Sequence, residues 1–336
     1  MTLKVPTVDD SPIWSAWMAA FHAPTLAIAD EIGLFAAIAA APIGSDELAT
    51  MLAIELRATE AIAGLMTALG FLALVDDKFE LTETARTYLL PSSPFYWGGM
   101  LRRIRENPLD CRKLIDSLRR GKAAADARLT AMWQAPQPPT EALIAFTHAM
   151  HAHSFSLAVR TISKLALRGR LLDVAGGSGS YSIAAALHDP GLCCTLLDLP
   201  PVCGVAANYA ADYGVSDRVS SVPADMFVED WPLHHEAILL ADIFHDWDDE
   251  RCRVLASRAF AALPSRGRVL IHEMLLADDK VGPATAISYS MIMVFVTQGR
   301  QRTAPEVRAI LETAGFGDIR VIPTANGYSA IEGTRP

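Results

Sequence analysis

Residues 170–182 read Arg-Leu-Leu-Asp-Val-Ala-Gly-Gly-Ser-Gly-Ser-Tyr-Ser, and the expected fold can be built outward from them. The stretch begins as a short apolar strand, is broken by glycines at 176, 177 and 179, and continues at Ile183–Leu187 with residues that favour a helix. Because glycine has no Cβ, a ligand can approach the backbone of this turn, and the following helix offers unpaired N–H groups. The stretch therefore predicts a strand, a ligand-binding turn and a helix.

A carboxylate follows the next apolar run. Cys193 to Leu197 is followed by Asp198, nineteen residues beyond Gly179. A carboxylate at the carboxyl end of a strand can accept hydrogen bonds from both hydroxyls of a ribose. Ser182 replaces the third glycine of the dinucleotide-binding pattern, which favours a cofactor that carries adenosine without phosphates. Turn and acid together predict a nucleoside cofactor.

Strands and helices alternate from residue 170 to residue 275. This alternation predicts an α/β domain with a doubly wound, mostly parallel sheet, whose ligands bind beyond the carboxyl ends of the strands. Polar residues at or near such ends are therefore candidates for the site: Asp198, Asp225, His245 and Glu273.

Two of these candidates have informative neighbours. Asp225 could accept a hydrogen bond from the amino group of adenine, with Met226 and Phe227 packed on the faces of the base. His245 follows an apolar run at 237–244, which is expected to form one strand up to Phe244.

The N-terminal part predicts a separate helical domain. Residues 11–41 are apolar on all sides of the expected helices, which indicates burial on more than one side and makes a partner subunit a plausible cover. Two helices and a hairpin around Asp76-Asp77 form a winged-helix pattern, but the second helix has no basic face, which favours dimerisation over DNA binding. The predicted domains are 1–100 for dimerisation, 101–168 as a helical substrate-binding connection, and 169–336 for cofactor binding and catalysis.

Composition narrows the possible partners. The 336 residues carry a net charge of -9, which disfavours nucleic acid, and 51% of them are hydrophobic, which favours apolar surface buried between subunits. A homodimer that takes a small-molecule substrate is expected.

The cysteines and the N-terminus indicate a cytoplasmic protein. The five cysteines include no Cys-x-x-Cys pair, and the histidines at 148, 151 and 153 are not spaced as ligands on one helix face, so no metal site is predicted. The first ten residues lack the apolar core of a signal peptide, and no apolar run is long enough to span a membrane.

With these motifs the sequence resembles the S-adenosylmethionine-dependent small-molecule O-methyltransferases of the plant caffeate and bacterial antibiotic type. The similarity covers nearly the whole chain. It is most specific in four stretches: Leu172–Gly179 for the cofactor loop, Leu197–Pro200 for the ribose-binding acid, Ala224–Phe227 for the adenine site, and His245–Trp247 for the catalytic histidine.

The resemblance implies S-adenosyl-L-methionine as cofactor and an N-terminal domain that builds an intertwined dimer. Phe146, Met150 and Ser154 match the helix that contacts the substrate and the methionine end of the cofactor. The expected cofactor-binding residues are Asp173, Ala175, Gly176, Gly177, Asp198, Leu199, Asp225, Met226, Phe227 and Ser154, and the expected substrate-binding residues are Phe146, Met150, Asp246, Tyr289 and Met293.

The sequence departs from the family in two places. Glu273 matches one of two acids that flank the histidine, but Gln301 stands where the other acid is normally a Glu. The family's adenine-side lysine has no clear equivalent, since Leu233 and His234 stand nearby.

The expected catalytic residues are His245, Glu273 and Gln301. A phenol with a pKa near 10 is mostly neutral at pH 7, so a base must remove its proton before the oxygen attacks the methyl carbon. His245 is expected to be that base, and Glu273 to hold the ring and stabilise the imidazolium. Gln301 can form a hydrogen bond but cannot supply the charge that makes a histidine more basic.

Two other functions stay open at this point. One is methylation of carbon in an enolisable substrate such as a 2-oxo acid, with possible help from a metal. The second histidine that relatives with that chemistry use is absent from residues 294–297. The other is a protein of the same fold that binds S-adenosylmethionine without transferring methyl groups, or that senses a ligand.

Overall fold

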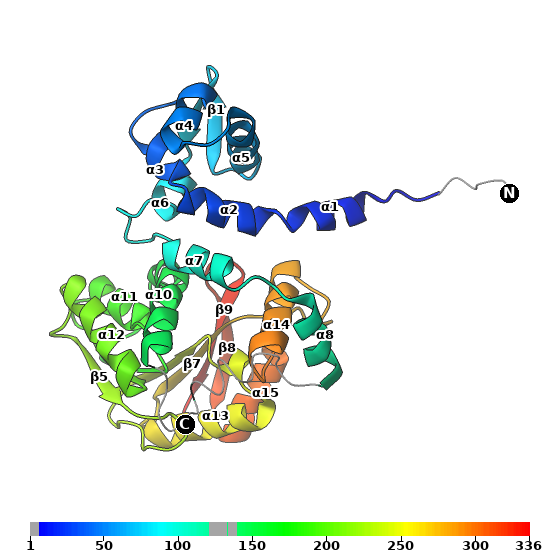
Figure 1. The fold of residues 1–336 in the computed structure, drawn as a ribbon. Coiled ribbons are helices and arrows are strands. Elements are labelled where there is room, and N and C mark those ends of the chain that lie inside the picture. Colours follow the sequence, from blue (N-terminus) through cyan, green and yellow to red (C-terminus); the bar gives the residue numbers. More distant parts are fainter. Residues whose placement is uncertain (1–6, 121–132, 134–139) are drawn as a thin grey trace. The chain divides into compact units, whose positions relative to one another are not determined.

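The computed structural model describes residues 7–120, 133 and 140–336, and it divides the chain into two units, Met1–Leu109 and Asp110–Pro336 (Figure 1). Parts of the predicted connection at 101–168 therefore lie outside the described residues. Each unit is described by itself.

The first unit is helical, with one two-stranded hairpin. Its core contains Leu34, Phe35, Leu48, Met66 and Leu72, all at most 2% exposed. The predicted hairpin is present, and β1 pairs with β2 in antiparallel register. The elements are α1 (Ser11–Ala19), α2 (His22–Glu31), α3 (Leu34–Ala39), α4 (Ser45–Leu52), α5 (Leu56–Ala68), β1 (Leu72–Val75), β2 (Lys78–Leu81), α6 (Glu83–Tyr88) and α7 (Gly98–Glu106).

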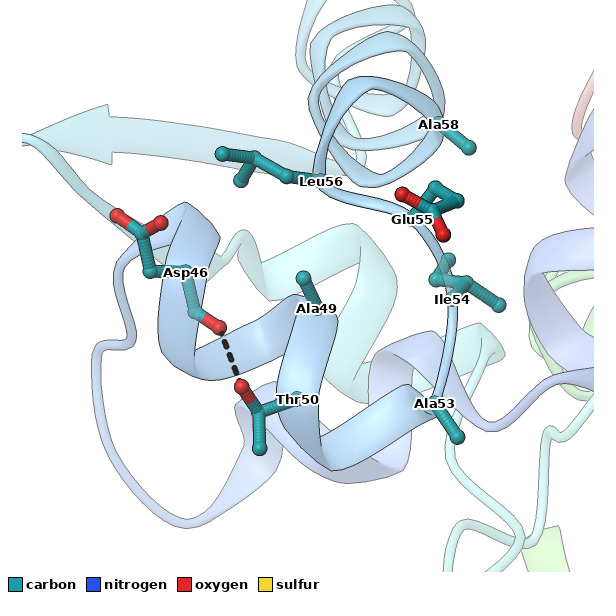
Figure 2. A pocket seen from close by; sticks show the side chains of 8 residues that line it. All are labelled: Asp46, Ala49, Thr50, Ala53, Ile54, Glu55, Leu56 and Ala58. Carbon is teal, nitrogen blue, oxygen red and sulfur yellow. Dashed lines mark hydrogen bonds between the residues drawn. The ribbon is translucent and has the colours of Figure 1, made fainter.

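Two surface features of this unit are notable. Helix α1 contains no buried residue, although it carries Ile13, Trp14 and Trp17, each more than half exposed. An open hollow of about 630 Å³ lies between α4 and α5, lined by Asp46, Ala49, Thr50, Ala53, Ile54, Glu55, Leu56 and Ala58 (Figure 2). The hollow has no histidine or cysteine in its lining and contains none of the predicted site residues.

The second unit is built on a seven-stranded sheet with the order β5-β4-β3-β6-β7-β9-β8. The first five strands of this order pair in parallel, and β9 runs antiparallel to both β7 and β8. The strands are β3 (Arg170–Val174), β4 (Cys193–Asp198), β5 (Val219–Pro223), β6 (Ala237–Ala241), β7 (Arg268–Met274), β8 (Gly317–Pro323) and β9 (Tyr328–Thr334). This is the expected doubly wound, mostly parallel sheet.

Helices cover both faces of the sheet (Figure 1). Helix α10 packs against α11 and α12 on one side, and α13 packs against α15 on the other. With helices on both faces the central strands are apolar throughout, and in β6 residues 237–240 are all buried. The helices are α8 (Cys111–Arg120), α10 (Thr140–Ile162), α11 (Ser180–His188), α12 (Pro200–Asp212), α13 (Asp249–Ala262), α14 (Ala284–Val296), α15 (Ala304–Ala314) and the 3-10 turn η1 (Phe244–Asp246).

Within the described ranges, no helix combines the length and the apolar character needed to cross a membrane.

Candidate active site

The glycine turn lies at the carboxyl end of β3 and leads directly into α11. Gly177 and Gly179 have positive φ values of 60° and 76°, a backbone region that side chains with a Cβ rarely adopt. A Cβ on Gly177 would meet no atom within 4 Å, so the space beside this turn is open. On Gly176 a Cβ would come within 2.6 Å of the carboxyl carbon of Asp173, which fixes glycine at that position.

Asp198 ends β4 beside this turn. Its Oδ2 accepts a hydrogen bond from the N–H of Gly177 at 2.8 Å, and its Oδ1 accepts one from Leu199 at 2.7 Å. Burial raises the pKa of Asp198 to about 6, against the lowering effect of these two hydrogen bonds. The ribose-binding acid expected from the sequence is thus tied directly to the glycine turn.

The predicted adenine-side residues follow β5 and are joined to the same edge of the sheet. The N–H of Ala224 donates to the carbonyl of Asp198 at 2.8 Å, and Asp225 Oδ1 accepts from the N–H of Phe227 at 2.8 Å. Phe227 and Met226 are half-buried, and the ring of Phe227 lies edge-on to Trp247, with the centroids 4.9 Å apart. Trp247 stands two residues after His245, so it connects the two halves of the candidate site.

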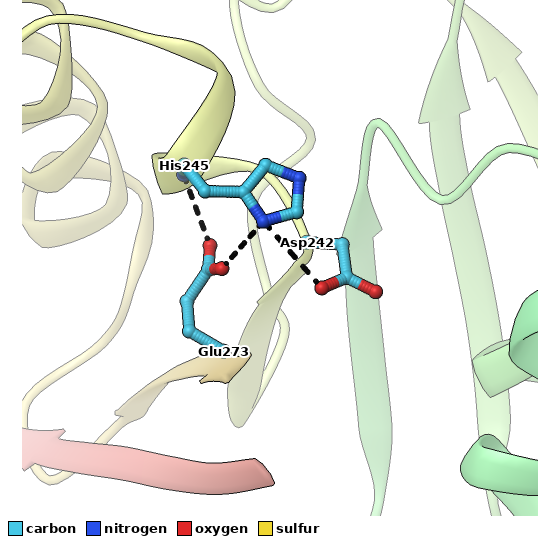
Figure 3. Close-up of side chains that lie close together, drawn as sticks. All are labelled: Asp242, His245 and Glu273. Atoms are coloured by element: carbon cyan, nitrogen blue, oxygen red, sulfur yellow. Dashed lines mark hydrogen bonds and ion pairs between the residues drawn. The ribbon is translucent and has the colours of Figure 1, made fainter. Parts of the chain in front are cut away.

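His245 lies in η1 and is surrounded by carboxylates (Figure 3). Its Nδ1 is 2.9 Å from Glu273 Oε2 on β7 and 3.6 Å from Asp242 Oδ1, and its Nε2 is 3.7 Å from Asp246 Oδ1. Glu273 also accepts a hydrogen bond at Oε1 from the backbone N–H of His245 at 3.2 Å. One carboxylate therefore holds both the ring and the backbone of the histidine.

The Gln301 side chain lies beside the same ring nitrogen of His245, Nδ1. Its Nε2 lies 3.3 Å from His245 Nδ1, and its fully buried side chain leaves Oε1 without a hydrogen-bond partner among the described residues. The three predicted catalytic residues are therefore brought together around one imidazole.

The carboxylates make the imidazole strongly basic. Burial by itself disfavours the charged ring, but the attraction of Glu273, followed by that of Asp246 and Asp242, outweighs it and raises the pKa of His245 to about 10. Burial raises the pKa of both Asp242 and Asp246 to about 7. The cluster therefore shares protons among its members near neutral pH.

The segment 298–302 wraps around η1 and fixes its backbone. Arg302, with a side chain 3% exposed, donates from Nη1 to the carbonyl of Phe244 at 2.6 Å and from Nη2 to that of Trp247 at 2.8 Å. Asp249 holds the same guanidinium at 2.7 and 3.0 Å. A Cβ on Gly299 would lie 2.0 Å from the carbonyl oxygen of His245, so only glycine fits there.

Helices α10 and α14 carry the predicted substrate-side residues. Phe146, Met150 and Ser154 are half-buried and spaced four residues apart, which places them on one face of α10. On α14, the Tyr289 ring centroid lies 5.0 Å from that of His245, and Met293 is buried. Phe146 packs with Trp133, Leu143 and Val296, and Ser154 Oγ lies 3.3 Å from Nδ1 of His153. Tyr289 is the substrate-side residue that this geometry brings against the imidazole, along with Asp246.

Three residues that the sequence did not single out belong to this site: Asp242, Gly299 and Arg302. The predicted strand 237–244 is too long, because β6 ends at Ala241 and Asp242 begins the turn into η1. With that boundary known, Asp242 would have counted among the strand-end acids. Asp242, His245 and Glu273 each offer a ligand atom within 4.8 Å of the others, so these three side chains could also hold a metal ion.

A comparison with known protein families decides the class of this site. Residues 112–317 match the family model described as an O-methyltransferase domain, which covers more than half of the chain. The chain belongs to the O-methyltransferase family.

Relatives of this O-methyltransferase match along most of its length. It is 34% identical over 316 residues to 3-hydroxy-5-methyl-1-naphthoate 3-O-methyltransferase from Streptomyces sahachiroi, covering 91% of this chain and 90% of that one. It is 28% identical over 318 residues to acetylserotonin O-methyltransferase from Bos taurus, covering 90% of each chain.

Among solved structures, human N-acetylserotonin methyltransferase in complex with SAM superimposes with a TM-score of 0.84 over 99% of both chains at 23% identity. PigF with SAH gives a TM-score of 0.78 over 98% of this chain and 100% of that one at 22% identity. The predicted family, fold class and enzyme class are confirmed.

Proposed function

We propose that this O-methyltransferase methylates a hydroxyl group of a small aromatic secondary metabolite and that His245 is the general base. S-adenosylmethionine is the cofactor, and it supplies a methyl group on a positively charged sulfur. The observation that carries the proposal is a buried imidazole whose Nδ1 lies 2.9 Å from Glu273, at the same edge of the sheet as the glycine turn.

The residues of the turn suit this cofactor. Asp198 offers a carboxylate at a strand end, and Gly177 leaves open space beside the backbone. Asp173 has a buried Oδ1 without a hydrogen-bond partner among the described residues, which suits an ammonium group. The residues proposed to hold the cofactor are Asp173, Ala175, Gly176, Gly177, Asp198, Leu199, Asp225, Met226, Phe227 and Ser154.

The basicity of His245 suits a phenolic acceptor. A phenol has a pKa near 10, and the pKa of His245 is raised to about 10, so a proton passes from the phenol to the neutral imidazole at almost no free-energy cost. The neutral share of His245 grows as the pH rises towards 10, so turnover is expected to rise with pH. With Nδ1 held by Glu273, Nε2 is the ring nitrogen that receives the proton. Phe146, Met150, Asp246, Tyr289 and Met293 are proposed to shape the acceptor site.

Analysis of the methylated product tests the proposed function. We expect the protein, given S-adenosylmethionine with a ¹³C-labelled methyl group, to label 3-hydroxy-5-methyl-1-naphthoate, N-acetylserotonin or another phenol of a panel on oxygen. The NMR spectrum of the product distinguishes oxygen-bound from carbon-bound methyl. A carbon-bound methyl, or activity that EDTA abolishes, would instead support metal-assisted C-methylation.

A homodimer is proposed on the evidence of α1. This helix exposes Ile13, Trp14 and Trp17 and buries none of its residues within one chain, which suits burial against a second copy. Light scattering should give a mass twice that of the chain, and a monomeric mass at micromolar concentration would contradict the proposal.

A further inference from the structure

Asp242 combines a left-handed backbone with a largely buried carboxylate, and the Tyr328 hydroxyl is one of the groups that act on that carboxylate. Its φ is 56°, in the left-handed region, and its backbone N–H donates to the carbonyl of His272 at 3.0 Å. Its side chain is only 16% exposed, and Oδ1 has no hydrogen-bond partner among the described residues. A buried carboxylate oxygen without a donor is destabilising unless a positive charge faces it.

The positive charge that faces Asp242 is that of the His245 ring in the state in which Nε2 also carries its proton. Oδ1 lies 3.6 Å from Nδ1, on the side of the ring where Glu273 also lies (Figure 3). The Gln301 amide nitrogen lies 3.3 Å from the same Nδ1. Gln301 is neutral, so the carboxylates on the Nδ1 side of the ring are Glu273 and Asp242, while Asp246 lies on the Nε2 side. Asp242 thus supplies, from the turn after β6, a second carboxylate that the 301 position does not provide.

We propose that Asp242 is a positioning residue that acts with Glu273 to keep the His245 ring oriented with a proton on Nδ1, leaving Nε2 free for the acceptor. The inference rests on the proposed function of His245 as base. A left-handed backbone accepts Asn and Gly as readily as Asp, so the conformation alone does not require a carboxylate here. The charge is what distinguishes Asp242 from those residues.

Other titratable groups also face this cluster, and the test must separate Asp242 from them. Burial raises the pKa of Tyr289 well above its usual value, with the nearby acids adding to the effect, and burial lowers that of His153 to about 4. Neither group therefore changes its charge over the pH range in which His245 titrates. The facing groups are Glu273 on β7, Asp246 in η1, Tyr289 on α14, Tyr328 on β9, His153 on α10 and Tyr181 on α11.

The test is a titration of His245 by long-range ¹H–¹⁵N NMR in the free protein, which needs no acceptor. The protein is treated with EDTA beforehand, so that no metal ion binds to Asp242, His245 and Glu273 during the titration. We expect Asp242→Asn, which fits the left-handed backbone and removes the charge, to lower the pKa of His245 by about one unit or more. Adding Gln301→Glu to that variant should restore most of the shift, because it returns a carboxylate to Nδ1. The exposed acid Asp278 gives a matched control, and Asp278→Asn should leave the pKa unchanged.

Activity assays distinguish the inference from the proposed function. With a phenol that the wild-type protein methylates, Asp242→Asn should move the rising limb of the kcat/KM profile to lower pH and lower its plateau. Gln301→Glu should reverse both changes. Asp242→Gly, which also tolerates positive φ, repeats the test if the Asn variant does not fold.

An unchanged His245 titration in both Asp242 variants would overturn the role of Asp242 and leave the role of His245 intact. A lowered His245 pKa in Asp242→Asn that Gln301→Glu does not raise again would also overturn the role of Asp242. Full turnover in a protein without His245 would instead overturn the proposed function.

Discussion

Replacement of His245 by Asn is expected to lower kcat for methyl transfer to a phenol by about two to four orders of magnitude. The physical reason is that the phenol then loses its most basic neighbour, and the buried Glu273 and Asp242 lose the positive charge that faces them. The measurement is turnover at saturating S-adenosylmethionine and acceptor. Retention of wild-type turnover would contradict the assignment.

A matched pair of binding measurements separates chemistry from cofactor affinity. The His245 variant should bind S-adenosylhomocysteine with nearly unchanged affinity, because His245 is not among the residues proposed to hold the cofactor. Calorimetry measures this affinity. Asp198→Asn should show the opposite behaviour and weaken binding by about tenfold, since it removes a charged acceptor at the ribose position. If both variants lost binding, the division of the site into a cofactor half and a base half would be wrong.

Replacement of Gly299 by Ala is expected to lower kcat about a hundredfold and the free energy of unfolding by about 3 kcal/mol. A Cβ there would lie 2.0 Å from the carbonyl oxygen of His245 and 2.6 Å from the backbone nitrogen of Trp247. Backbone atoms of a turn cannot rotate away as a side chain can, so η1 must shift and carry the imidazole with it. Urea unfolding and steady-state kinetics measure the two effects.

Gly204 on α12 offers the control for this substitution. It is exposed, it lies inside a helix, and a Cβ on it would meet no atom within 4 Å. Gly204→Ala should therefore leave activity unchanged and stabilise the protein by up to about 1 kcal/mol. Wild-type activity in the Gly299 variant would show that η1 can be displaced without harm and would refute the supporting role of segment 298–302.

The parts of the site that could be predicted are those marked by a sequence pattern that spans only a few neighbouring residues. The glycine turn at 176–179 and the acid at Asp198 follow from strand, breaker and charge patterns within a few residues. His245 and Glu273 could be placed because both stand at or near the ends of apolar runs in a parallel sheet. The fold class followed from the same alternation of strands and helices.

The parts that could not be predicted depend on contacts between distant segments. Asp242 stands inside an otherwise apolar run, so the sequence does not mark the end of the strand there, and the η1 turn that follows is held by a segment 56 to 60 residues beyond Asp242. An arginine is usually exposed, but the carbonyls of Phe244 and Trp247 and the carboxylate of Asp249 hold the Arg302 side chain in the interior. No periodicity encodes such pairings.

The wrapping of η1 by residues 298–302 has a consequence for how this enzyme could acquire new acceptors. That loop continues directly from α14, the helix that brings Tyr289 against the imidazole ring. A shift of α14 that widened the acceptor pocket would therefore displace residues 298–302, which position His245. Each increase in pocket size would then lower the rate of catalysis. Divergence towards bulkier acceptors is therefore expected to proceed through side-chain exchanges on α10, which leave that loop undisturbed.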